Sequence, residues 1–452
     1  MTKSIKNCSK MKKNIQMMKI STQKYLLTIC LVAATMCLAV HETGAQIPAA
    51  PQTAPVALTG GTIYTVSGEV IKNGTLLFED GIITAVGTDV AIPENAIRED
   101  VSGKYIYPGL IDAFSRMGIY EIGMVTMTVD INEQGRVNPN VRVEMAFNPE
   151  SRHIGIARSA GITISVTTPG GGLISGQSAA MLMDGWSWDA MTLKSGAGMI
   201  VNWPSPANEE NYSENLQELR NAFADARAYK IARLAMNEGR SVRHDLDTRW
   251  EAMIPVFERE MPVIVHANEV HQIQDAIAWA EEEDVRLIIL GGRDSHLVTE
   301  HLKAHNVPVI VTEVLASPNR AWEGYDARYS LPAKLYRAGV TFAISGAPDA
   351  ANANRLPYEA GASAAYGLPV EEAIKAITLY PAEILGIRDR VGALEPGMDA
   401  TLLISDGNPV EYATQVEQVY IRGRKSDMND MHRQLYQKYR QKVEEWRESG
   451  SQ

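Results

Sequence analysis

The chain of 452 residues has only three cysteines, Cys8, Cys30 and Cys37, and all of them lie close to its N-terminus. We expect that part of the chain to be removed, so the mature protein would have no disulfide, no thiolate metal ligand and no cysteine nucleophile. Basic residues are also scarce, because 43 Lys and Arg face 54 Asp and Glu, which gives a net charge of -11. A nucleic-acid-binding protein needs a positive surface to release counterions from phosphates, so this class is excluded.

The rest of the composition is that of a globular protein. Hydrophobic residues make up 45% of the chain and charged residues 21%. Values close to the globular averages exclude a disordered or collagen-like chain. The length leaves room for one large domain and a smaller one.

The N-terminus has the order of segments that is typical of an export signal. Residues 1–24 carry seven lysines and no acid, residues 25–40 are mostly apolar, and small residues follow at 43–45. This order predicts a signal peptide over 1–45 and a secreted or periplasmic protein without a membrane span after cleavage. The apolar segment is shorter than the ~20 residues of a comfortable span. An uncleaved anchor and a start at Met18 are alternatives.

Cleavage at this point would make the protein distinctly acidic. It would remove seven lysines and one glutamate, which changes the net charge from -11 to -17. All three cysteines would leave with the same segment. The absence of thiols suits an oxidising compartment such as a bacterial periplasm.

Short β-rich segments occur near both ends of the mature chain. A Pro- and Ala-rich flexible lead over 46–55 precedes them. Residues 56–105 and 388–425 combine Val, Ile and Thr with Gly-containing turns, which predicts a small composite β-sandwich domain closed by both chain ends. The highly charged segment 426–452 predicts a C-terminal helix.

Strands and helices alternate between these segments, over 106–387. The strand candidates are 106–111, 162–168, 180–183, 199–201, 261–266, 286–290, 307–311 and 340–344. The helix candidates are 213–237, 270–283, 297–305 and 369–378. Eight strands with intervening helices predict an α/β fold, a (β/α)8 barrel of the TIM type, which usually takes ~250 residues. A doubly wound open sheet is the alternative.

Three segments, taken in order, resemble one known family. Residues 107–113, YPGLIDA, resemble the segment that opens the barrel in metal-dependent amidohydrolases. Residues 367–386, GLPVEEAIKAITLYPAEILG, are similar to the family's last barrel helix, and residues 391–403, VGALEPGMDATLL, to its return into the small β domain. The resemblance covers nearly the whole mature chain and is closest to the imidazolonepropionase-like branch. It implies a hydrolase with its site at the carboxyl-terminal mouth of the barrel.

The chain departs from the family at the first strand. Family members follow the aspartate of the opening segment with His-x-His, and because residues two apart on a strand point the same way, both imidazoles face the barrel axis. Here the two positions are Phe114 and Arg116. A phenyl ring cannot bind a metal, and a guanidinium places a fixed positive charge where a cation would sit. We therefore expect no ordinary two-metal site.

Other residues match the family's site in part. The segment 262–268, PVIVHAN, matches the fifth strand, and implies His266 as a metal ligand and Asn268 as a substrate-binding residue. His296 stands for the sixth-strand histidine, and Asp349 is the carboxylate nearest to the eighth-strand proton acceptor. The partial match implies either one divalent metal, with zinc preferred over other metals, or no bound metal. The alternatives are a hydrogen-bonded core histidine, an exposed helix-start histidine and a turn aspartate, respectively.

Two functions follow from this partial match. The first is an exported hydrolase of a small-molecule C–N bond other than a peptide bond, with a single-metal or impaired site. His266 and His296 would hold the metal, and Asp349 would take a proton from its water. The second is an inactive barrel that binds a partner, as a homo-oligomer or with a catalytically complete relative. Arg116 would then bind a carboxylate.

Overall fold

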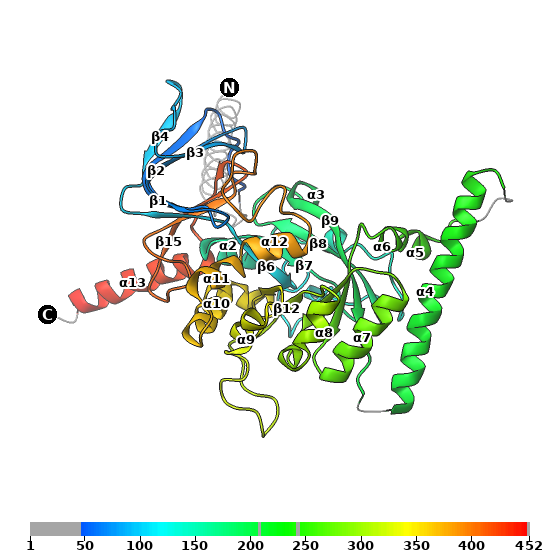
Figure 1. The fold of residues 1–452 in the computed structure, drawn as a ribbon. Coiled ribbons are helices and arrows are strands. Elements are labelled where there is room, and N and C mark those ends of the chain that lie inside the picture. Colours follow the sequence, from blue (N-terminus) through cyan, green and yellow to red (C-terminus); the bar gives the residue numbers. More distant parts are fainter. Residues whose placement is uncertain (1–46, 207–208, 241–244, 450–452) are drawn as a thin grey trace, which may run out of the picture. The chain divides into compact units, whose positions relative to one another are not determined.

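A computed structural model describes residues 47–206, 209–240 and 245–449. The predicted signal peptide, 1–45, lies outside these residues. Residues from 48 onward form one compact unit, and its strands fall into two eight-stranded sheets (Figure 1). No helix within the described ranges is long and apolar enough to cross a membrane.

The first sheet takes strands from both ends of the chain. Its order is β16-β15-β14-β5-β1-β2-β3, and β4 pairs with β1 beside this path. The bounds are β1 Val56–Tyr64, β2 Val70–Glu79, β3 Ile82–Gly87, β4 Ile97–Asp100, β5 Tyr105–Pro108, β14 Leu402–Ser405, β15 Val416–Ile421 and β16 Arg424–Lys425. Strands from the N-terminal and C-terminal parts of the chain thus form one continuous sheet rather than two separate sheets. Its core contains Leu58, Phe78, Leu402 and Tyr420.

The second sheet is a nearly closed barrel, which confirms the predicted fold class. Its order is β13-β12-β11-β10-β9-β8-β7-β6. The bounds are β6 Leu110–Ser115, β7 Ile162–Thr167, β8 Ile174–Leu182, β9 Thr192–Asn202, β10 Val263–Ala267, β11 Leu287–Gly291, β12 Val309–Val311 and β13 Phe342–Ile344. All neighbours are parallel except at β8, which is antiparallel to both β7 and β9.

The antiparallel β8 follows from the lengths of its connections. A parallel crossover needs a dozen or more residues, whereas antiparallel neighbours can be joined by a short turn. Only the loop 168–173 separates β7 from β8, and α3 (Trp188–Met191) is the sole helix between β8 and β9. The segment predicted at 180–183 is therefore the end of a reversed strand.

The seam between the first and last barrel strands is closed by a side chain. The Ser345 hydroxyl, just after β13, accepts a hydrogen bond from the Phe114 amide at 3.1 Å. It also lies within hydrogen-bond distance of Asp112 Oδ1 and of the Phe114 carbonyl, both on β6. These contacts join β6 to β13 where the two strands have no ladder of paired residues.

The chain passes from one sheet to the other at Gly109, so the single strand predicted at 106–111 is two strands. The Gly109 amide donates to the Thr401 carbonyl at 3.0 Å, and the next amide, that of Leu110, donates to the Gly161 carbonyl at 3.0 Å. A Cβ at Gly109 would lie 2.1 Å from Thr163 Oγ1. Only glycine lets the backbone approach β7 this closely.

Helices and 3-10 turns fill the connections. The helices are α2 Arg152–Ser159, α3 Trp188–Met191, α4 Glu209–Asn237, α5 Thr248–Glu251, α6 Ile254–Phe257, α7 Val270–Glu282, α8 Thr299–Ala304, α9 Leu331–Ala338, α10 Leu356–Ala365, α11 Val370–Lys375, α12 Leu379–Ile384 and α13 Met431–Ser449. The turns are η1 Thr126–Thr128, η2 Val143–Ala146, η3 Ser295–Leu297 and η4 Ala350–Arg355. Helices α4, α7, α8 and α11 occupy the predicted helical segments within a few residues.

Helix α7 shows how sequence fixes one of these helices next to the site. Glu269 and Gln272 form a reciprocal capping box at its N-terminus, which satisfies backbone N–H groups that have no partner within the helix. Ile273, Ala276 and Ile277 recur at helical spacing and are buried. This apolar face packs α7 against the barrel strands β10 and β11 (Figure 1).

Candidate active site

The carboxyl-terminal ends of the parallel strands form the mouth of the barrel. In TIM-type barrels, catalytic groups stand at these ends. β6 delivers Arg116 to the mouth, β10 delivers His266 and Asn268, and β12 delivers Glu313. Asp349 follows β13.

The two positions that depart from the family lie against each other. Phe114 is buried in the barrel core, and the Arg116 guanidinium lies over its ring, 5.4 Å from the centroid. Arg116 Nη1 donates to the Thr168 carbonyl after β7. Burial lowers the pKa of Arg116 to about 10, so the guanidinium remains charged at neutral pH. The structure thus places a cation, and an apolar ring beneath it, at the end of β6.

His266 is the imidazole of the mouth. It is the one exposed residue of β10, whose other residues are buried. Its pKa is lowered, first by the surrounding protein atoms and then by the charge of Arg116, while Glu313 opposes the shift. A side chain that is exposed to solvent and is also surrounded by protein atoms lies on the wall of a concave surface, which here is the mouth of the barrel. At neutral pH the ring is uncharged, because its ordinary pKa is about 6.5.

Asn268 orients this imidazole. Its side-chain amide nitrogen lies 3.3 Å from His266 Nε2. An amide nitrogen can only donate, so Nε2 accepts and the ring proton of the neutral form sits on Nδ1. The Asn268 amide is itself held from behind, since its Oδ1 accepts from the Arg293 amide at 3.4 Å.

Glu313 is a mouth residue that the sequence reading missed. It lies two residues after β12, and its carboxylate is 3.6 Å from Arg328 Nη1. Its backbone φ of 55° is unusual for a residue other than glycine. Such strain collects at functional sites. Its position just past a predicted barrel strand was a usable signal, because carboxylates there face the mouth.

Two buried acids lie beneath the mouth, and neither was singled out by the sequence. Asp112 on β6 is fully buried, and burial raises its pKa to about 6 even though Ser345 and the Gly346 amide hydrogen-bond to Oδ1. Its Oδ2 has no hydrogen-bond partner within the described chain. Burial also raises the pKa of Glu359 on α10 to about 7, and the charges of Asp112 and Glu313 add to this shift.

Asp349 acts as a cap in this structure. Its carboxylate accepts from the Ala351 amide at 3.0 Å and from Asn352 Nδ2 at 3.4 Å, at the start of η4. This is the turn geometry that stood as the alternative to a proton acceptor. The position that the resemblance implies for the eighth-strand aspartate falls near Gly346 or Ala347, neither of which carries a carboxylate, and the Gly346 amide donates to Asp112.

His296 lies on η3 and lines a cavity beside the mouth. Its pKa is lowered by burial first and by the charge of Lys334 second. Asn268 lines the same cavity. Over residues 47–206, 209–240 and 245–449, no three His, Cys, Asp or Glu side chains come together as metal ligands would. The donors present therefore do not make the site that the resemblance implies, and the metal roles of His266 and His296 stay predictions.

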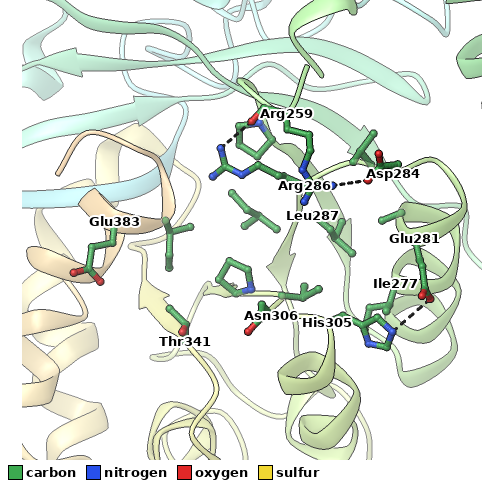
Figure 2. Close-up of a pocket in the computed structure, with 17 residues that line it drawn as sticks. Arg259, Ile277, Glu281, Asp284, Arg286, Leu287, His305, Asn306, Thr341 and Glu383 are labelled. Atoms are coloured by element: carbon green, nitrogen blue, oxygen red, sulfur yellow. Dashed lines mark hydrogen bonds and ion pairs between the residues drawn. The ribbon is translucent and has the colours of Figure 1, made fainter. Parts of the chain in front are cut away.

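A larger cavity, of about 560 Å³, lies at the opposite end of the strands (Figure 2). Its lining includes the residues that come directly before three barrel strands, Pro262 before β10, Arg286 before β11 and Pro308 before β12. Arg259 pairs with Asp284 at 2.6 Å, and His305 lies 3.4 Å from Glu281. Charged groups here pair with one another, which fits the stabilising role of this end of such barrels.

The barrel has the fold of the amidohydrolase structures that the chain matches. The model of the amidohydrolase family matches residues 190–431, more than half of the chain. The chain therefore belongs to the amidohydrolase family.

Individual relatives agree with this assignment. The amidohydrolase tasK of Hapsidospora irregularis is 25% identical over 410 residues, which are 77% of this chain but 39% of that protein. An amidohydrolase from Thermotoga maritima MSB8 is 27% identical with a TM-score of 0.75, over 82% of this chain and 99% of the other. A prolidase with bound N-methylphosphonate-L-proline, 16% identical with a TM-score of 0.51 over 82% and 99%, supports the fold alone.

Proposed function

We propose that this chain is an exported hydrolase that cleaves a C–N bond other than a peptide bond in a small anionic molecule. The observation that carries the proposal is Arg116. Its charged guanidinium stands beside His266, and its side chain hydrogen-bonds a carbonyl but forms no ion pair within the described residues. A partly buried cation without a counter-ion is costly, and a carboxylate of the substrate would remove that cost.

The mouth residues divide the work of hydrolysis among them. Arg116 holds the substrate's anionic group. Water replaces Asn268 at Nε2, the one acceptor nitrogen of neutral His266, and gives a proton to it; the resulting hydroxide attacks the carbonyl carbon. Glu313 stabilises the imidazolium that forms. The proton then passes from His266 to the nitrogen as the C–N bond breaks, which releases an amine and a carboxylic acid, and the acid's proton passes to the amine in solution, so His266 is neutral again.

Metal has no step in this scheme because the donor set does not fit one. Phe114 and Arg116 replace two ligands, and the described side chains contain no group of three donors. A second candidate function rests on the same observation. A barrel that has lost its ligands and gained a cation could serve only to bind an anionic small molecule or a related subunit.

The test is hydrolysis of a panel of N-acyl amino acids and lactam carboxylates by the purified protein, with elemental analysis of the same preparation. We expect activity that Arg116→Met reduces mainly through a higher KM, and His266→Ala by about 10²- to 10⁴-fold in kcat. Arg98→Met, a change of an exposed arginine on β4, is the control and should leave both unchanged. Activity that follows bound metal would overturn the scheme. Carboxylate binding without turnover would favour the second candidate.

Export is supported by the order of charged, apolar and small residues over 1–45. Expression of the full chain in a bacterial host followed by fractionation tests it. We expect a mature form that begins near residue 46 in the periplasmic fraction. A full-length protein in the membrane fraction would show the uncleaved anchor instead.

A further inference from the structure

A second cavity adjoins the mouth and has a different character. Its volume is about 190 Å³, and the ends of β11 and β12, helix α9 and the segment 320–328 supply its walls. Asn268 lines it and also contacts His266. The cavity therefore lies directly behind the residue that orients the imidazole.

The cavity wall carries more positive than negative charge. Four arginines or lysines line it against two acids, which are Arg293, Arg320, Arg328 and Lys334 against Asp294 and Glu323. The side chains of the three arginines are already engaged by acids. Arg320 pairs with both Asp294 and Glu323, Arg328 lies near Glu313, and Arg293 lies near Glu269.

Lys334 is the exception. Its side chain is half-buried on α9 and lines the cavity, and its ammonium has no hydrogen bond or ion pair with any residue that the structure describes. It lies close enough to His296 for its charge to lower the pKa of that ring. A half-buried ammonium that has no counter-ion and faces a cavity favours the binding of an anion there, because the anion would offset the cost of burying the charge.

We propose that this cavity binds a carboxylate of a small molecule through Lys334. The inference rests on the proposed function in one respect: it makes the cavity a second anionic subsite for the same substrate, behind Asn268, while Arg116 holds the first. The volume is below the roughly 300–1,000 Å³ of drug-sized pockets. It therefore suits the acidic end of a molecule whose remainder lies in the mouth, and the substrate class becomes an amide or lactam with two acidic groups.

Trp322 offers a local signal for the test, because it lines the cavity with 72% of its surface exposed and with Arg320 over its ring at 4.3 Å. The full chain is titrated with succinate, and the fluorescence change that Trp322→Phe abolishes is followed. We expect Lys334→Met to raise the Kd for succinate at least tenfold. Lys303→Met is the matched control, since Lys303 is exposed on α8 and lies 3.6 Å from Glu300, and it should leave the Kd unchanged.

The remaining arms separate this inference from the hydrolysis. Succinate binding is measured without turnover. If the protein hydrolyses nothing in the panel but binds succinate with an affinity that depends on Lys334, the proposed hydrolysis is wrong and the proposed carboxylate site in the cavity is supported. The Arg116→Met variant should keep the Trp322 response. Equal Kd values for wild type and Lys334→Met would overturn the inference. Inorganic phosphate that binds more tightly than succinate would overturn the assignment of a carboxylate.

Discussion

At the scale of single residues, burial and two opposite neighbouring charges together determine the pKa of His266 in the mouth. Arg116 lowers the pKa of His266 and Glu313 raises it. Because Arg116 and Glu313 shift the pKa of His266 in opposite directions, their presence beside the imidazole can be tested without a substrate. The test also asks whether the three side chains share one site in solution.

We predict that Arg116→Met raises the pKa of His266, because it removes a positive neighbour. Glu313→Gln should lower the pKa further, because it removes the charge that favours the imidazolium. Titration of the imidazole resonances by NMR, with His266→Ala to assign the signal, measures both shifts. Shifts of the same sign in the two variants, or none, would show that these groups do not meet in the mouth.

The buried Glu359 makes a prediction about stability. Its pKa is about 7 in the fold, above the ordinary value of 4.5. A raised carboxyl pKa means that the folded state holds the proton more tightly than the unfolded chain. The group therefore costs nothing below pH 4.5, costs more as the pH rises toward 7, and costs its full amount above 7.

Glu359→Gln should consequently stabilise the protein at pH 8 by up to about 3 kcal/mol and leave it almost unchanged at pH 4.5. Gln can still accept the hydrogen bond from the Leu315 amide, which is 2.7 Å long. Urea unfolding at both pH values is the measurement, and Glu150→Gln at an exposed position is the control. A variant that is less stable at pH 8 would contradict the buried, costly charge.

The sequence predicted part of this site and could not predict the rest. The place of His266 at a strand end follows from the alternation of a β-strand, so a sequence can indicate it. The cluster of Asp112, Glu313 and Glu359 joins β6, the segment after β12, and α10. Contacts between elements so far apart in the chain depend on the three-dimensional packing and leave no spacing pattern.

At the scale of elements, glycine decides where one sheet ends and the next begins. A Cβ at Gly109 would overlap Thr163 Oγ1 and Cγ2, at 2.1 and 2.4 Å. We predict that Gly109→Ala lowers the free energy of unfolding by about 1–3 kcal/mol through overpacking. Adding Thr163→Ala should recover part of the loss.

Denaturant unfolding of both variants checks this prediction. Gly87→Ala is the control, since its nearest contact would be at 3.7 Å. A Gly109→Ala variant as stable as wild type would mean that β6 and β7 can move apart at this point.

The eight barrel strands could be located from the sequence because each is a short apolar segment between turns. Their directions are a separate matter. The pattern of buried residues is the same for a parallel and an antiparallel central strand, so β8 could be recognised as reversed only from its short connections. Likewise, the continuous apolar sequence through Pro108 and Leu110 hides the change of sheet at Gly109.

At the scale of the whole molecule, the C-terminal helix α13 contributes little to the fold. It contains no buried residue, and Leu435, Tyr439 and Trp446 are exposed. Arg433, near its start, donates to the Val416 and Met428 carbonyls. The helix is thus anchored at its first turn.

We predict that truncation before Leu435 changes the free energy of unfolding by less than about 1 kcal/mol, because almost no apolar surface leaves a packed environment. Thermal unfolding of the truncated chain is the measurement. Arg433→Ala in the full chain probes the anchor separately. A large loss on truncation would show that α13 packs on something in solution, such as a second copy.

Because a few hydrogen bonds through Ser345, Gly346 and Arg116 join β6 to β13, and no ladder of paired strand residues does, the barrel is weakest along this seam. Amides on β6 and β13 should exchange with solvent sooner than those of β10 and β11, which are laddered on both sides. The seam between β6 and β13 lies beside Asp112 and Arg116. Local opening of this seam would therefore change the width of the barrel mouth through which an anionic substrate enters.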